Sequence, residues 1–406
     1  MFVSSRGQRV NEEKLLSPEL IGKPGLETPT AENNFRSYAI FLVGGIVLYL
    51  LVVLPVNLLV DPHLTFPHLA LSRLSEFRLT NSRIAKANQT SRGGIDIAVL
   101  GSSRSANALT NPPTRAEGYR FVNLALPNTS LLELRNVNTY LFSHNQPSEL
   151  IIGIEFDFFN YEFIPDDFLK SRFNPTLRTS ELLLEEALGR YAFQKSIDVL
   201  RTARGGNDGD NSRLSRLAKF EILLADAVRL ARDIPPPPRY SPKRLALLRQ
   251  TVDEARTHGA KVNVVMMPVH SSLLLTYELL GLWPSFDAWK RDVVLALNGT
   301  DAGIWDFNGT DPRQAEAIPV GDGDMKWFTD ASHASRAYGD LILRALVTND
   351  ARDDEFGVRL DLNNLEARLH NVRSRLNRLM NDRPDLVDLA TRVVRADSTR
   401  RALQMR

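Results

Sequence analysis

The sequence contains no cysteine among its 406 residues. A disulfide scaffold and a cysteine-ligated metal site are therefore both excluded. The absence of cysteine is compatible with an oxidising compartment but does not require one. The seven histidines are scattered through the chain and show none of the spacing that zinc ligands usually have. We therefore expect neither a metal nor another cofactor.

The sequence also lacks an excess of charge of one sign. Lys and Arg number 50 and Asp and Glu 48, which leaves a formal net charge of +2. A nucleic-acid-binding protein usually carries a strongly basic face, so we do not expect a nucleic-acid partner. The composition, 43% hydrophobic and 24% charged, is typical of a globular protein with one large or two smaller domains.

Only one apolar run is long enough to cross a bilayer, and it extends over residues 38–60 without a charged residue. A spanning helix needs roughly 20 apolar residues and tolerates Gly and Pro inside it. A cleaved signal peptide would be shorter and nearer the N-terminus, and a buried core helix rarely needs so long an uncharged run. We therefore predict a single transmembrane helix at 38–60, which makes the lipid bilayer an expected partner.

Basic residues are unevenly distributed around this helix. The next basic residue after it is Arg73, whereas five basic residues precede it: Arg6, Arg9, Lys14, Lys23 and Arg36. Positive charge near the ends of a span stays cytoplasmic. We therefore predict a cytoplasmic tail at 1–37, a single pass through the cell (inner) membrane, and an extracytoplasmic location for everything from residue 61.

Short apolar runs alternate with helical segments through most of residues 93–348. This pattern is typical of buried parallel strands joined by crossover helices. The predicted strands are 95–100, 121–126, 150–156, 262–267 and 303–307. The sequence thus predicts an α/β domain with a doubly wound, flavodoxin-like parallel sheet.

Three segments do not follow the alternation. Residues 61–92 are predicted to be a connector, and residues 160–242 a helical insertion over the sheet edge. Residues 349–406 are predicted to form a C-terminal helical tail, because leucines from Leu360 to Leu379 recur at near-helical spacing. That tail either packs on the domain or lies on an anionic membrane surface.

The first candidate site is the abrupt end of strand 95–100, where Gly101, Ser102, Ser103 and Arg104 follow. In open α/β sheets, ligands bind outside the carboxyl ends of the strands. The glycine permits a tight turn, and the next residues place small or polar groups at that edge. The same residues can also simply cap the next helix.

The second candidate site is Asp330 and His333, just before a predicted helix at 334–348. An Asp three residues before a His can fix the imidazole tautomer and leave its other nitrogen free as a base. Alternatively, the Asp caps a turn and the His lies on the surface. Together with a serine at another strand end, the pair supplies the three roles of serine-based acyl transfer.

These motifs resemble those of the SGNH (GDSL-like) hydrolase and acyltransferase superfamily over residues 95–348. In that family, G-D-S follows the first strand and D-x-x-H precedes the last helix. The resemblance implies Ser103 as nucleophile, His333 as general base and Asp330 as its orienting partner. Ser102 replaces the motif's Asp, as in membrane-anchored bacterial members similar to the D-alanine transfer protein of teichoic acids.

The sequence departs from this family at two positions of the expected oxyanion hole. Asn128 matches a usual glycine and Asp157 a usual asparagine. An ionised carboxylate cannot donate a hydrogen bond to an oxyanion. Asp157 must therefore be protonated, pair with Arg104 or do something else. His270, after strand 262–267, is a candidate for substrate binding or for a structural role.

The sequence therefore predicts an extracytoplasmic serine acyltransferase or esterase that acts on a cell-envelope glycan or a lipid-linked saccharide. A membrane-bound acyl donor protein is a candidate partner. The alternative is a non-catalytic envelope protein that binds polysaccharide or a membrane partner through the same crevice.

The predicted topology can be tested with reporters fused after residue 406. A reporter that is active only after export should give signal, because the charge bias keeps the N-terminus inside. Signal from a reporter that functions only in the cytoplasm would contradict the predicted orientation.

Overall fold

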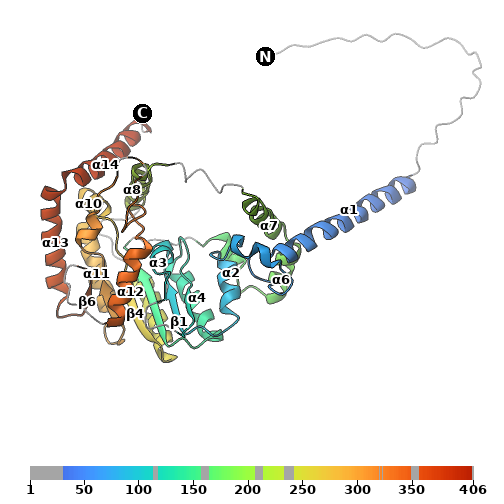
Figure 1. Cartoon of the computed structure of the whole chain (residues 1–406), viewed down its shortest axis with the longest axis horizontal. Coiled ribbons are helices and arrows are strands. Elements are labelled where there is room, and N and C mark those ends of the chain that lie inside the picture. The colour runs from blue at the N-terminus through green and yellow to red at the C-terminus, as the bar shows by residue number, and fades with distance from the viewer. Residues whose placement is uncertain are drawn as a thin grey trace, which may run out of the picture. The chain divides into compact units, whose positions relative to one another are not determined.

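The computed structural model describes most of the chain, which divides into two units, Met1–Val52 and Val53–Arg406. The described residues are 31–112, 118–156, 164–205, 214–232, 242–319, 321, 323–348 and 356–404. The second unit contains a six-stranded sheet (Figure 1), whose strands are ordered β2-β1-β3-β4-β5-β6. Its strands are β1 (Ile97–Leu100), β2 (Phe121–Asn123), β3 (Glu149–Ile154), β4 (Lys261–Met266), β5 (Gly303–Asp306) and β6 (Val358–Leu360).

The five predicted strands are all present, and they pair in parallel. β1, β3, β4 and β5 are buried along almost their whole length, as their continuous apolar runs predicted. β6 is antiparallel to β5 and was not predicted, because the C-terminal tail was expected to be helical throughout. The sheet is therefore mostly parallel rather than purely parallel.

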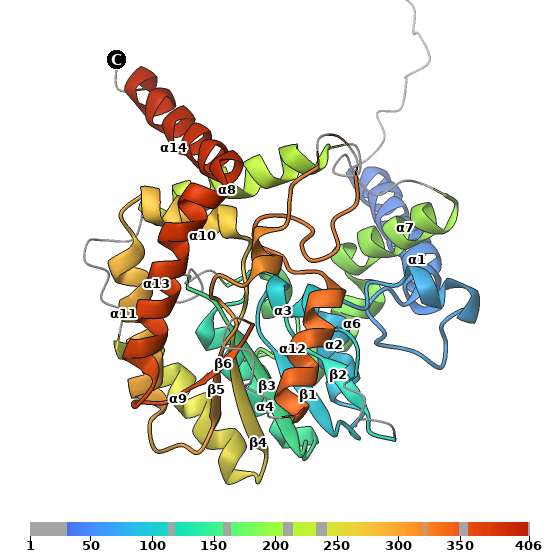
Figure 2. The same cartoon turned by 60° about the vertical axis from the view of Figure 1, so that its left-hand side comes forward.

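Helices lie on both faces of the sheet (Figure 2). The chain passes from β1 to β2 in one direction and from β3 to β5 in the other, so right-handed crossovers place the connecting helices on opposite faces. One face carries α3 (Ser103–Ala108) and α12 (Arg336–Thr348), and the other carries α4 (Leu131–His144), α9 (Pro242–Thr257) and α11 (Trp283–Leu297). The reversal lies between β1 and β3, where ligands bind in doubly wound sheets.

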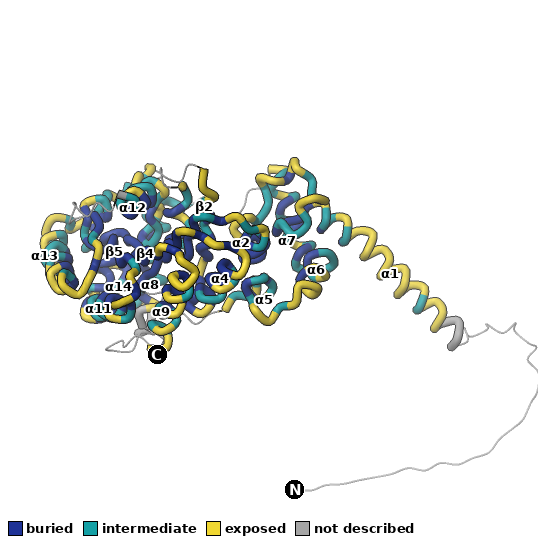
Figure 3. The backbone as a smooth tube through the Cα atoms, turned by 90° about the horizontal axis from the view of Figure 1, so that it is seen from below, coloured by how far each residue is buried: buried dark blue, intermediate teal, exposed yellow. Residues whose placement is uncertain are grey.

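Helix α1 (Ala31–Val60) contains the predicted span. Among the described residues it is the one helix long and apolar enough to cross a membrane, over Phe35–Val60. Only 6% of its most apolar window is buried, and Figure 3 shows α1 exposed over most of its length. A core helix of a soluble protein would be mostly buried, so the exposure of this window is consistent with a span.

The predicted connector, 61–92, packs as part of the domain. It contains the 3-10 helix η1 (Ser72–Phe77) and helix α2 (Arg83–Thr90). All but one residue of α2 are buried, including the charged Arg83 and Lys86. Helix α2 is therefore packed into the domain, against α4 and α5, and is not part of a solvated link.

The predicted insertion is helical between β3 and β4, as expected. Its described helices are α5 (Asp166–Leu169), α6 (Thr179–Leu188), α7 (Arg190–Ala203) and α8 (Arg216–Arg232). Helix α7 contacts α6 and η1, whereas α8 contacts α10 (Ser271–Leu279) and α14 (Pro384–Gln404). The insertion thus contributes to two separate parts of the domain.

The C-terminal tail packs on the domain, which favours the first of its two predicted placements. Helix α13 (Leu365–Asp382) buries Leu365, Leu369 and Leu376 on one face. Helix α14 packs against α8 and α10. Most of the apolar surface that the spacing predicted is thereby covered by protein.

A buried ion cluster attaches this tail to the sheet. Asp306, at the end of β5, accepts hydrogen bonds from Lys290 at 2.9 and 3.0 Å and from Arg368 of α13 at 2.9 Å. Burial alone would raise the pKa of Asp306, but the charges and hydrogen bonds of Lys290 and Arg368 hold that pKa below its ordinary value. The carboxylate is thus the shared counter-ion of two buried cations.

We expect Asp306→Asn to destabilise the protein by about 3–5 kcal/mol, because it leaves two buried cations without their counter-ion. The free energy of unfolding of the full chain in detergent measures this effect. The matched control is Glu366→Gln. It removes the exposed Arg291–Glu366 ion pair, which joins α11 and α13, the helices that carry Lys290 and Arg368, and it should have a much smaller effect.

The effect of Asp306→Asn should also depend on pH. Because the folded pKa is depressed, the stabilisation is fully present above the ordinary pKa of about 3.9 and is lost as the pH falls below it. A difference between wild type and variant that stays constant into strong acid would contradict the ionised cluster.

Candidate active site

The turn after β1 positions the candidate nucleophile. Gly101 has φ +146°, and a Cβ there would lie 2.4 Å from Ser105 Oγ, so the position requires glycine. Ser102 caps α3, because its Oγ accepts a hydrogen bond from the N–H of Arg104 at 3.1 Å. Ser103 is therefore the first residue of α3, at the carboxyl edge of the sheet.

Ser103, His333 and Asp330 form a continuous hydrogen-bonded series. His333 Nε2 lies 2.9 Å from Ser103 Oγ, and His333 Nδ1 lies 2.8 Å from Asp330 Oδ2. A carboxylate cannot donate, so Nδ1 carries the proton and Nε2 accepts from the serine hydroxyl. The three residues that the sequence placed in these motifs thus come together in the order that proton transfer requires.

The loop that carries Asp330 and His333 is held by its backbone. Phe328 and Ala334 form an antiparallel bridge on either side of it. The carboxylate of Glu316 accepts hydrogen bonds from the N–H groups of residues 326–328 at 2.6–3.2 Å. The position of the imidazole is therefore fixed by groups outside the motif itself.

His270 is part of this support and does not line the pocket. Its Nδ1 accepts a hydrogen bond from the N–H of Ser272 at 3.2 Å, and its Nε2 donates to the carbonyl of Glu316 at 2.8 Å. The backbone N–H of His270 donates to the carbonyl of Ala331 at 3.1 Å. Burial lowers the pKa of His270 to about 4, so the ring is neutral near pH 7. The structural alternative for His270 is therefore the one that the structure favours.

A pocket of about 280 Å³ opens beside the series. Five of its lining residues are ones that the sequence predicted: Ser102, Ser103, Arg104, Asn128 and His333. Seven others also line it: Thr129, Glu155, Leu223, Asp226, Ala227, Leu230 and Ser332. Asp157 lies outside the described residues. In the part of the chain that the structure describes, no His, Asp and Glu side chains are grouped in a way that could hold a metal ion.

Glu155 is a buried pocket residue that the sequence analysis missed. The Ser102 hydroxyl donates to Glu155 Oε1 at 2.6 Å while it accepts the N–H of Arg104. Glu155 therefore helps to fix the turn that carries Ser103. The sequence feature that could have indicated Glu155 is its place as a carboxylate near the end of the otherwise apolar predicted strand 150–156.

The loop before Asn128 is held by helix α2. Lys86 Nζ donates to the carbonyl of Ala125, and Arg83 donates to the carbonyl of Pro127 at 2.6 Å. Asn128 adopts a left-handed conformation, with φ +52°, which non-glycine residues adopt infrequently. The buried cations of the predicted connector thus keep Asn128 at the pocket wall.

No protein-family model matches the chain, and a comparison with curated proteins gives no match. The assignment of a function therefore depends on the geometry of the site.

We expect the stability of the protein to depend on Lys86 in alkaline solution. Burial, aided by the charge of Arg83, lowers the pKa of Lys86 from 10.5 to about 8. Between these values the unfolded chain binds more protons, so folding becomes more favourable as the pH rises, by roughly 3 kcal/mol in all. Lys86→Met removes this contribution.

The measurement is the free energy of unfolding of wild type and Lys86→Met across pH 7 to about 11, a range that includes both the lowered and the ordinary pKa of the lysine. The difference, wild type minus variant, should rise with pH. A difference that does not change with pH would contradict the buried, hydrogen-bonded lysine.

Proposed function

We propose that the chain is a membrane-anchored, extracytoplasmic serine acyltransferase or esterase that acts on a cell-envelope glycan or a lipid-linked saccharide. The observation that supports this most strongly is the series Ser103–His333–Asp330, with both imidazole contacts at hydrogen-bond length. The earlier resemblance to the SGNH superfamily gives the same three residues the same roles.

In the first half-reaction, Ser103 Oγ attacks the carbonyl carbon of an acyl ester. The hydroxyl proton passes to His333 Nε2, and the Asp330 carboxylate stabilises the resulting imidazolium. The bond between the acyl carbon and the leaving oxygen then breaks, and His333 returns the proton to that oxygen. The product is an alcohol, and the acyl group stays on Ser103 as an ester.

In the second half-reaction, a hydroxyl group or water attacks the acyl ester on Ser103, and His333 acts first as base and then as acid. A glycan hydroxyl gives transfer, and water gives hydrolysis. The backbone N–H of Ser103 is a donor for the oxyanion, and Asn128, on the pocket wall, offers a side-chain amide. An anchor that holds the domain in the membrane raises the effective concentration of membrane-borne substrates.

A fluorophosphonate probe tests this proposal on the full chain in detergent. The expected result is covalent labelling of Ser103, abolished by Ser103→Ala. His333→Ala should slow labelling by about 10²–10⁴, the usual contribution of a positioned base. Ser143→Ala is the matched control, because Ser143 is exposed on α4 and should not affect labelling.

An unlabelled wild-type protein that remains folded would contradict the proposal. That result would favour the alternative class, an envelope protein that binds polysaccharide or a membrane partner without a reaction.

A further inference from the structure

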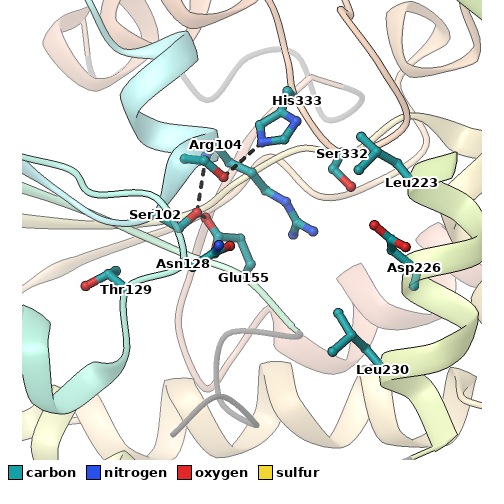
Figure 4. Close-up of a pocket in the computed structure, with 12 residues that line it drawn as sticks. Ser102, Arg104, Asn128, Thr129, Glu155, Leu223, Asp226, Leu230, Ser332 and His333 are labelled. Atoms are coloured by element: carbon teal, nitrogen blue, oxygen red, sulfur yellow. Dashed lines mark hydrogen bonds between the residues drawn. The ribbon is translucent and has the colours of Figure 1, made fainter. Parts of the chain in front are cut away.

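Helix α8, in the insertion, has two apolar faces with different surroundings. Phe220, Leu224 and Val228 recur at helical spacing and are completely or almost completely buried. Leu223, Ala227 and Leu230 lie on the neighbouring face, which lines the pocket beside Ser103. Figure 4 shows Leu223 and Leu230 directed from α8 into that pocket. The first face fixes the helix in the core, and the second leaves an apolar strip open to the pocket.

Helix α8, which carries the strip, is joined to the loop that carries Asp330 and His333. Arg216, the first residue of α8, donates to the carbonyl of Thr329 at 3.1 Å, one residue before Asp330. On the outer side, Arg392 of α14 pairs with Glu221 at 3.2 Å. The first turn of α8 is therefore joined directly to the loop that carries His333, and α14 holds the helix from another side.

The opposite side of the pocket is polar. It consists of residues at the ends of β1 and β3 and in the loop after β2: Ser102, Arg104, Asn128, Thr129 and Glu155. On the α8 side, Asp226 pairs with Arg229 of the same helix, which offsets its charge. A substrate with one hydrocarbon part and one hydroxyl-rich part would match these two sides in only one orientation.

We propose that Leu223, Ala227 and Leu230 form the binding surface for the acyl chain, and that the substrate is a short-chain acyl ester of a polyhydroxylated alcohol. The small side chain of Ala227, in the middle of the strip, leaves space for the acyl chain of the substrate. A pocket of about 280 Å³ lies below the usual range of roughly 300–1,000 Å³ for drug-sized ligands, which favours a short acyl group. This inference rests on the proposed function of Ser103.

The test measures the labelling rate of Ser103 in the full chain with methyl, butyl and octyl fluorophosphonates. In each reaction a bond forms between Ser103 Oγ and phosphorus, fluoride leaves, and the serine proton passes to His333. Ala227→Phe should slow the butyl and octyl probes by at least about tenfold, a typical effect of changed shape in an apolar pocket. Labelling by the methyl probe should change little, which shows that the variant is folded and the series intact.

Two further variants complete the test. Leu230→Ala enlarges the strip and should speed labelling by the octyl probe relative to the methyl probe. Ile222→Phe is the matched control, because Ile222 is 48% exposed on α8 and outside the pocket, and it should leave all the ratios unchanged.

The possible failures are distinguishable. If wild type reacts with no probe, the proposed function is wrong, and the acyl surface with it. If Ser103 reacts but Ala227→Phe and Leu230→Ala leave the chain-length ratios at the wild-type values, the proposed function stands and the acyl surface is overturned. Ala227→Val, a smaller change, replaces Ala227→Phe if the latter does not react with the methyl probe.

Discussion

Backbone groups in the loops at the carboxyl edge lie outside helices and strands, so they need other hydrogen-bond partners. Buried and half-buried side chains supply several of them. Lys86 and Arg83 bind the carbonyls before Asn128, and Glu316 binds the N–H groups before His333. His270 in turn binds the carbonyl of Glu316. The geometry of Ser103 and His333 therefore depends on polar residues that lie outside the pocket.

This arrangement gives each segment outside the sheet a part in the site. The connector supplies α2, whose cations hold the Asn128 loop. The insertion supplies α8, which forms one wall of the pocket. The tail supplies α14, which packs on α8, and α13, which is joined to β5 through Arg368 and Asp306. A buried charge is costly unless paired, so these contacts also limit the packing alternatives open to the three segments.

The sequence was sufficient to predict the strands of the parallel sheet and the residues of the series. Buried parallel strands leave continuous apolar runs, and the residues that follow such runs meet at one edge. Ser103 and His333 could thus be paired across 230 positions. Membership in the SGNH superfamily stays a prediction, because it depends on short motifs and not on the sheet as such.

Other features leave weaker signals in a single sequence. β6 has only three residues, Val358 to Leu360, and an alternation of apolar and polar residues identifies a strand only over about 4–8 residues. The pocket face of α8 could not be predicted, because helical spacing shows that Leu223 and Ala227 share a side but not what lies opposite. The role of His270 depends on contacts with Ser272 and Glu316, and the second of these lies 46 positions away.

The last turns of α1 belong to the folded domain. Asn57 is completely buried, donates to the carbonyl of Ala187 at 3.2 Å and accepts from Ser196 at 3.1 Å. His63, shortly after the helix, lies 2.9 Å from the buried Glu186. An amide that is bonded to α6 and α7 belongs to the protein interior and not to lipid.

The part of α1 that can face hydrocarbon is therefore shorter than the whole apolar run. Residues 35–52 precede the domain and give a length of roughly 27 Å at 1.5 Å per residue, close to the bilayer core of about 30 Å. The helix then continues without a break to the residues that α6 and α7 hold. The apolar run predicted at 38–60 therefore combines a segment long enough to span a bilayer with residues that pack inside the domain.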